Sequence, residues 1–162
     1  MVCLGAVTLC NSSYERCRIA IQLARLSGFS PLITTASAHN RNLLTSLGAT
    51  HVLDRTLSSN ALKEQVAQIT DTPITYIFDA VSLKETQQAA FSLLAPGGTL
   101  AVVTEPQVKG GEENKKVFIV LGSFFVPQNR ELGVKFAKEL PLWLVREMIK
   151  VCTILLCVLD VY

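Results

Sequence analysis

Residues 31–54 constrain the fold of this chain more than any other segment. They read PLITTASAHNRNLLTSLGATHVLD, in which an apolar strand (32–35) leads into small hydroxyl residues and then a short helix (40–47). Gly48 ends that helix, and a second apolar strand (51–53) follows it. A strand, a helix and a strand in this order predict a parallel β-α-β unit, because parallel neighbours need a crossover connection.

The same alternation of strand and helix patterns continues along most of the chain. Strands are expected at 4–10, 32–35, 51–53, 74–78, 99–103 and 117–121, and helices at 18–26, 40–47, 61–69, 83–94 and 129–145. Such alternation predicts an α/β, Rossmann-like fold: a doubly wound parallel sheet of about six strands with helices on both faces. At 162 residues, we expect a single domain, residues 1–162.

Composition excludes several functional classes. A net charge of +2 without a basic stripe argues against nucleic acid, and the absence of an apolar run of about 18–20 residues argues against a membrane span. The five cysteines form no C-x-x-C pair and have no nearby histidine, so no metal site is expected. Their odd number and apolar surroundings predict reduced, buried thiols and a cytoplasmic protein.

The turn after the first strand lacks the glycines that a dinucleotide fold uses there. No glycine occurs between Gly5 and Gly28, so side chains crowd the backbone N–H groups that would meet a pyrophosphate, and Glu15 would repel it. Ser12 and Ser13 can still donate hydrogen bonds to a phosphate. The alternative is a structural turn that binds no phosphate tightly.

The end of the second strand favours NADP(H) over NAD. An acid at that point binds the free ribose 2′-hydroxyl of NAD, and none occurs in the segment that includes Ser37, Ala38, His39, Asn40 and Arg41. Ser37 and Asn40 can donate to a 2′-phosphate, and Arg41 can supply positive charge. Ser37 can also simply cap the following helix, and the two roles are compatible.

The end of the fourth strand adds a candidate contact with the ribose–nicotinamide part of the cofactor. Val81 and Ser82 are expected to border it, because ligands of open α/β sheets bind at the carboxyl ends of the strands. Asp79 has two interpretations, as a ligand contact or as a carboxylate that caps its own loop. We identify no catalytic residue, because no Ser-His-Asp spacing and no pair of carboxylates is present.

Several short motifs resemble those of the medium-chain dehydrogenase/reductase superfamily. They are residues 20–28 (AIQLARLSG), Leu47-Gly48-Ala49, Phe78-Asp79 and residues 94–100 (LAPGGTL). Within that superfamily the chain is most similar to the zinc-independent fungal branch that includes trans-acting enoyl reductases. The resemblance covers residues 18–145, whereas the ends, 1–17 and 146–162, diverge. Residues 94–98 also resemble a turn of methyltransferases, but the acidic residues of that class are missing.

The resemblance implies an NADP(H)-binding domain of an enoyl reductase or alcohol dehydrogenase-like oxidoreductase. It implies that residues 37–40 form the loop that binds the 2′-phosphate and that Leu121 and Gly122 lie near the nicotinamide ring. It also implies a small-molecule substrate such as an enoyl thioester, and a polyketide synthase as partner. An exposed sheet edge and the apolar tail, residues 151–162, favour a homodimer as the other partner. The N-terminal catalytic domain of such reductases is absent here, so we expect a truncated form with weak or no activity alone. The alternative is a non-catalytic fragment that binds a nucleotide or a partner.

Overall fold

The computed structural model describes residues 5–9 and 15–150 of the chain. The chain forms two compact units, residues 1–120 and 121–162.

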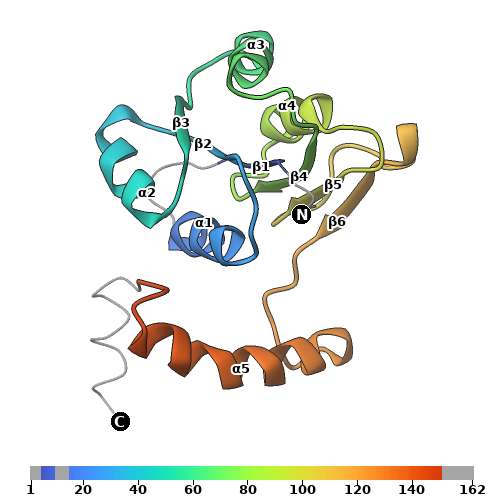
Figure 1. The fold of residues 1–162 in the computed structure, drawn as a ribbon. Coiled ribbons are helices and arrows are strands. Elements are labelled where there is room, and N and C mark those ends of the chain that lie inside the picture. The colour runs from blue at the N-terminus through green and yellow to red at the C-terminus, as the bar shows by residue number, and fades with distance from the viewer. Residues whose placement is uncertain (1–4, 10–14, 151–162) are drawn as a thin grey trace. The chain divides into compact units, whose positions relative to one another are not determined.

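The first unit is built on one six-stranded sheet (Figure 1). Its strands are β1 (Gly5–Leu9), β2 (Leu32–Ala36), β3 (His51–Asp54), β4 (Ile74–Asp79), β5 (Thr99–Val102) and β6 (Lys116–Ile119). They are ordered β3-β2-β1-β4-β5-β6, and each neighbouring pair is parallel. This is the doubly wound order of two mononucleotide-binding halves, and it confirms the predicted fold class.

Helices cover both faces of this sheet. They are α1 (Glu15–Leu26), α2 (Arg41–Leu47), α3 (Ser59–Ile69) and α4 (Lys84–Leu93), with α1 and α2 on one face and α3 and α4 on the other (Figure 1). The buried side chains form a separate core on each face. Ile21 of α1 and Leu44 of α2 belong to one core, whereas Leu62 of α3, Ala90 of α4 and Leu100 of β5 belong to the other. Burial on both faces explains the nearly continuous apolar strands.

The structure differs from the predicted boundaries at two places near the candidate site. Residues Ala38–Asn40 form a separate 3-10 turn, η1, and α2 begins only at Arg41. The last strand ends at Ile119, so the predicted strand over 117–121 is too long at its C-terminal end. Leu121 and Gly122 therefore follow the strand, in the second unit.

The second unit contains helix α5 (Arg130–Val145), which follows a 3-10 turn, η3 (Pro127–Asn129). Three aromatic side chains pack against one another in this unit. The ring of Phe136 lies 5.7 Å from that of Phe124 and 5.9 Å from that of Trp143, measured between centroids. Gly133 permits this packing, because a Cβ at that position would lie 2.7 Å from the Phe124 ring.

The structure also bears on the predictions about the cysteines and about membrane-spanning helices. Cys17 is buried as predicted, but it is disulfide-bonded, so the prediction of reduced thiols is wrong for this residue. The other four cysteines lie outside the described residues. Within residues 5–9 and 15–150, no helix is long and apolar enough to cross a bilayer.

Candidate functional site

The candidate site lies at the edge of the sheet where the parallel strands end. β1 lies between β2 and β4, so the strand order reverses there and a crevice forms beyond the carboxyl ends of these strands. Residues 10–14, which follow β1, are outside the described residues, and so are the candidates Ser12 and Ser13.

A cavity of about 400 Å³ opens at this edge, between the ends of β2, β3 and β4 and the first turns of α3 and α4. Its apolar lining consists of Leu57, Leu62, Val81, Leu83 and Ala89, and its polar lining consists of Thr35, Asp54, Arg55, Ser58, Ser59, Glu85 and Thr86. A pocket of this volume that combines apolar surface with polar groups is typical of sites that bind small molecules or cofactors.

The segment after β2 follows Thr35, which lines this cavity, but residues 37–41 do not line it themselves. Ser37 is extended, with φ −70° and ψ 147°, and precedes η1, and its side chain does not cap that turn. Ala38 and His39 are exposed, and the side-chain amide nitrogen of Asn40 lies 2.9 Å from Nε2 of His39. Arg41 is exposed at the start of α2. The structure thus brings these five predicted residues together in one corner, whereas their contact with a cofactor stays a prediction.

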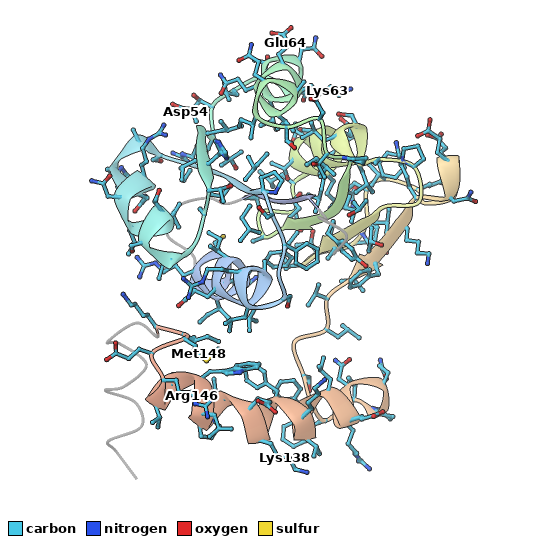
Figure 2. The ribbon with its side chains drawn as sticks, in the orientation of Figure 1. Asp54, Lys63, Glu64, Lys138, Arg146 and Met148 are labelled. Atoms are coloured by element: carbon cyan, nitrogen blue, oxygen red, sulfur yellow. The ribbon has the colours of Figure 1, made fainter. Side chains whose placement is uncertain are left out.

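The end of β3 adds two charged residues that were not assigned to the site from the sequence, although Asp54 belongs to the motif that resembles the family. Asp54 pairs in register with Ala36, the last residue of β2, and the Arg55 N–H donates to the carbonyl of Ala36 at 3.2 Å. Figure 2 shows Asp54 at the end of β3. The available signal was an Asp-Arg pair directly after an apolar strand, since parallel neighbours end at the same edge.

The Asp54 carboxylate caps its own turn. Its Oδ1 accepts hydrogen bonds from the Thr56 N–H at 2.8 Å and from the Thr56 hydroxyl at 2.7 Å. These two bonds are the main reason why the pKa of Asp54 lies below its ordinary value, and the positive charges of Arg55 and Arg41 lower it further. Both guanidinium groups therefore act on the same corner of the sheet edge.

Asp79, at the end of β4, caps the loop that follows it. Its side chain is fully buried, and Oδ1 accepts from the N–H groups of Val81 at 3.0 Å and Ser82 at 2.8 Å. Oδ2 accepts from the Thr86 hydroxyl at 2.7 Å. Of its two interpretations, the structure supports the loop cap. Burial raises the pKa of the Asp79 carboxyl above the ordinary 3.8, although hydrogen bonds from Ser82, Thr86 and Val81 oppose that shift.

This raised pKa predicts a specific pH dependence of stability. Between pH 3.8 and the higher folded pKa, the folded chain binds more protons at Asp79 than the unfolded chain does. The contribution of Asp79 to stability is therefore largest below pH 3.8 and is lost as the pH rises through the folded pKa. We expect the free energy of unfolding of the wild type, minus that of Asp79→Asn, to fall as the pH rises, in urea titrations followed by circular dichroism. A difference that grows with pH would contradict the assignment.

The two predicted residues after Asp79 have different environments. Val81 lines the cavity, where a cofactor can reach it. Ser82 is 5% exposed, and its hydroxyl donates to the Asp79 carbonyl at 2.6 Å and accepts from the Val103 N–H at 2.8 Å. Ser82 thus holds the backbone of the loops next to the cavity. The proposed proximity of both residues to the ribose and nicotinamide stays a prediction.

Leu121 and Gly122 belong to the second unit and are both exposed. The Leu121 carbonyl accepts from the Asn129 side-chain amide at 2.7 Å. Their predicted position near a nicotinamide ring is not tested by this arrangement. In the part of the chain that the structure describes, no group of three or more His, Cys, Asp or Glu residues comes together, so no residue is assigned to a metal.

Comparisons with known proteins agree with this geometry. A sequence model of the zinc-binding dehydrogenase family matches residues 18–131. A trans-enoyl reductase of Gibberella zeae, FSL5, is 34% identical over 88 residues, which are 54% of this chain and 24% of that protein. Another from Aspergillus japonicus, himH, is 35% identical over 102 residues, 62% of this chain and 29% of that protein. The chain thus spans about a quarter of the length of these curated relatives.

Solved structures share the fold at low sequence identity. The CurK enoyl reductase superposes with a TM-score of 0.71 at 16% identity, over 94% of this chain and 47% of that one. The nucleotide-binding subdomain of the PpsC enoyl reductase domain from Mycobacterium tuberculosis gives a TM-score of 0.65 at 17% identity, over 93% of this chain and 88% of that one.

Proposed function

The chain belongs to the zinc-binding dehydrogenase family, and from this premise we propose that it is the NADP(H)-binding part of an enoyl reductase-like oxidoreductase. The curated relatives in this comparison are named trans-enoyl reductases, and a nucleotide-binding subdomain of an enoyl reductase shares its fold. A nicotinamide cofactor is the ligand that this family and this fold have in common.

The observation that carries the preference for NADP(H) is the charge at the end of β2. No carboxylate follows β2, whereas the guanidinium groups of Arg41 and Arg55 lie close enough to Asp54 to lower its pKa. The Asp54 carboxylate is committed to Thr56 through two hydrogen bonds. The guanidinium groups of Arg41 and Arg55 thus outnumber the single Asp54 carboxylate at this corner, so that an anion such as a 2′-phosphate is favoured there.

The cavity beside this corner fits the adenosine part of the same ligand. Val81 and Leu83 supply apolar surface for a purine ring, and Thr35 supplies a hydroxyl at the end of β2. A volume of about 400 Å³ accommodates an adenosine-sized group. We assign no contact to the pyrophosphate, because the segment that would provide it is not described.

When bound, NADPH supplies a hydride for transfer to an activated carbon–carbon double bond, such as that of an enoyl thioester. The residues of this chain bind and orient the cofactor. Ser37, Asn40 and Arg41 hold the 2′-phosphate. Val81, predicted from the sequence to border the ribose–nicotinamide part, is instead assigned to the adenosine and its ribose, because it lines this cavity. Because this chain spans about a quarter of the length of its curated relatives, we further propose that it binds the cofactor and has little activity by itself. We also propose that the substrate is a small molecule and that the protein acts in the cytoplasm.

A titration of the purified chain with NADPH and NADH, followed by calorimetry, tests this proposal. NADPH is expected to bind at least about tenfold more tightly, because a charge-assisted bond contributes about 1.5–3 kcal/mol. The same sample is expected to oxidise NADPH with an enoyl thioester far more slowly than the usual ~1–10³ s⁻¹ of enzymes. Tighter binding of NADH would reject the NADP(H) assignment, and absence of binding by both would favour a non-catalytic fragment.

A further inference from the structure

We propose that Gln87 is a positioning residue, which fixes the loop after β5 (residues 103–107) where it contacts the nicotinamide half of the cofactor. This inference rests on the proposed function, because it presupposes a bound dinucleotide. Gln87 does not line the cavity assigned to adenosine. It acts through the backbone that it holds.

Gln87 lies in α4 and has no solvent exposure. Its side-chain nitrogen donates to the carbonyls of Ser82 and Glu105, each at 3.2 Å, and its side-chain oxygen accepts from the Gln107 N–H at 2.7 Å. One amide thus joins α4 to the loop after β4 and to the loop after β5. A buried amide is costly unless its groups are paired, so this one selects a single arrangement of the two loops.

Two further bonds tie the same loops together beside Gln87. The Ser82 hydroxyl accepts from the Val103 N–H at 2.8 Å, and the Thr104 hydroxyl donates to the Ser82 carbonyl at 2.8 Å. Ser82 itself has a φ of 54°, a left-handed conformation that is unfavourable for residues other than glycine. Such strain persists only where surrounding contacts hold it, and it is frequent in ligand-binding loops.

The position of this network in the sheet assigns it to the nicotinamide side. A dinucleotide lies across the two halves of a doubly wound sheet, here β1-β2-β3 and β4-β5-β6. The cavity and the corner at residues 37–41 place adenosine over the ends of β2, β3 and β4, and β5 lies on the far side of β4 from this cavity. The loop after β5 lies at the edge of the other half, and within 103–107 its bonds to Ser82 and Gln87 involve Val103, Thr104, Glu105 and Gln107.

The test compares two ligands, NADPH and adenosine 2′,5′-bisphosphate, which lacks the nicotinamide half. Gln87→Leu keeps the size of the side chain but cannot donate to either carbonyl or accept from Gln107. In the full chain we expect it to weaken NADPH binding by about 5- to 10-fold. Binding of the bisphosphate is expected to change by less than about twofold, because Asp79 still holds the Val81 and Ser82 N–H groups of the loop that lines the adenosine cavity. Gln88→Leu, the exposed neighbour in α4, is the matched control and is expected to change neither.

Thr104→Val provides a milder second variant if Gln87→Leu fails to fold. It removes one bond to the Ser82 carbonyl and is expected to shift the ratio of the two affinities in the same direction. An equal loss for both ligands would indicate general destabilisation and overturn the inference, and so would unchanged NADPH binding. A wild type that binds NADPH no more tightly than the bisphosphate also overturns it, while the proposed function stands. A wild type that binds neither ligand rejects both.

Discussion

Replacement of Arg41 by glutamine is expected to weaken NADPH binding by about tenfold and to leave NADH binding unchanged. The guanidinium of Arg41 is a charge at the corner where the 2′-phosphate is proposed to lie, and it already acts on the Asp54 carboxylate. A hydrogen bond between two charged groups contributes about 1.5–3 kcal/mol, and the lower value applies to an exposed side chain. Parallel calorimetric titrations of the two cofactors measure the effect directly.

The matched control for this variant is Lys63→Gln. Lys63 is an exposed residue of α3, does not line the cavity, and loses the same unit of charge when it is replaced (Figure 2). Its substitution is expected to preserve the affinity for both cofactors. If Arg41→Gln weakens NADPH and NADH equally, or weakens neither, Arg41 does not bind the 2′-phosphate.

Replacement of Asp79 by alanine is expected to lower the free energy of unfolding by about 3 kcal/mol. The change leaves the N–H groups of Val81 and Ser82 without their acceptor and takes one acceptor from the Thr86 hydroxyl. A buried donor without a partner costs about 1–3 kcal/mol, and the Thr86 hydroxyl keeps the Leu83 carbonyl as a second acceptor. Urea unfolding followed by far-ultraviolet circular dichroism measures the loss.

Asp71→Ala is the control for the alanine variant, because Asp71 is an exposed aspartate in the bend before β4. It is expected to change stability by less than about 0.5 kcal/mol, as is usual for surface positions. A loss at Asp79 no larger than at Asp71 would mean that the carboxylate does not hold the loop.

The fold was predictable because its evidence is local. Each strand carries an apolar run and each helix an apolar face, and Gly48 marks a helix end with a φ of 119°. These signals depend on neighbours within one element, so strand and helix types were correct. The boundaries were predicted less accurately, because few residues mark the end of an element as clearly as Gly48 does. β6 stops at Ile119, two residues before the predicted end, and the residues before Arg41 form a 3-10 turn.

The candidate site was predictable only where one segment contains it. The corner at residues 37–41 is continuous in sequence, and its lack of an acid is visible there. Asp54 and Arg55 reach the same corner only through the parallel register that pairs Ala36 with Asp54. An Asp-Arg pair after an apolar strand indicates only that both residues lie at this edge of the sheet and not which neighbouring strand end they meet, so these two residues were not assigned to the site.

The order of strands and helices and the lack of an acid at the end of β2 followed from the sequence alone, because both are properties of contiguous residues. The tertiary structure was needed to establish that Asp79 caps a loop, that Arg55 acts on the same corner as Arg41 and that Gln87 is fully buried between two loops. A polar side chain in a helix is usually exposed, and its burial depends on which distant carbonyls the fold brings within hydrogen-bond distance.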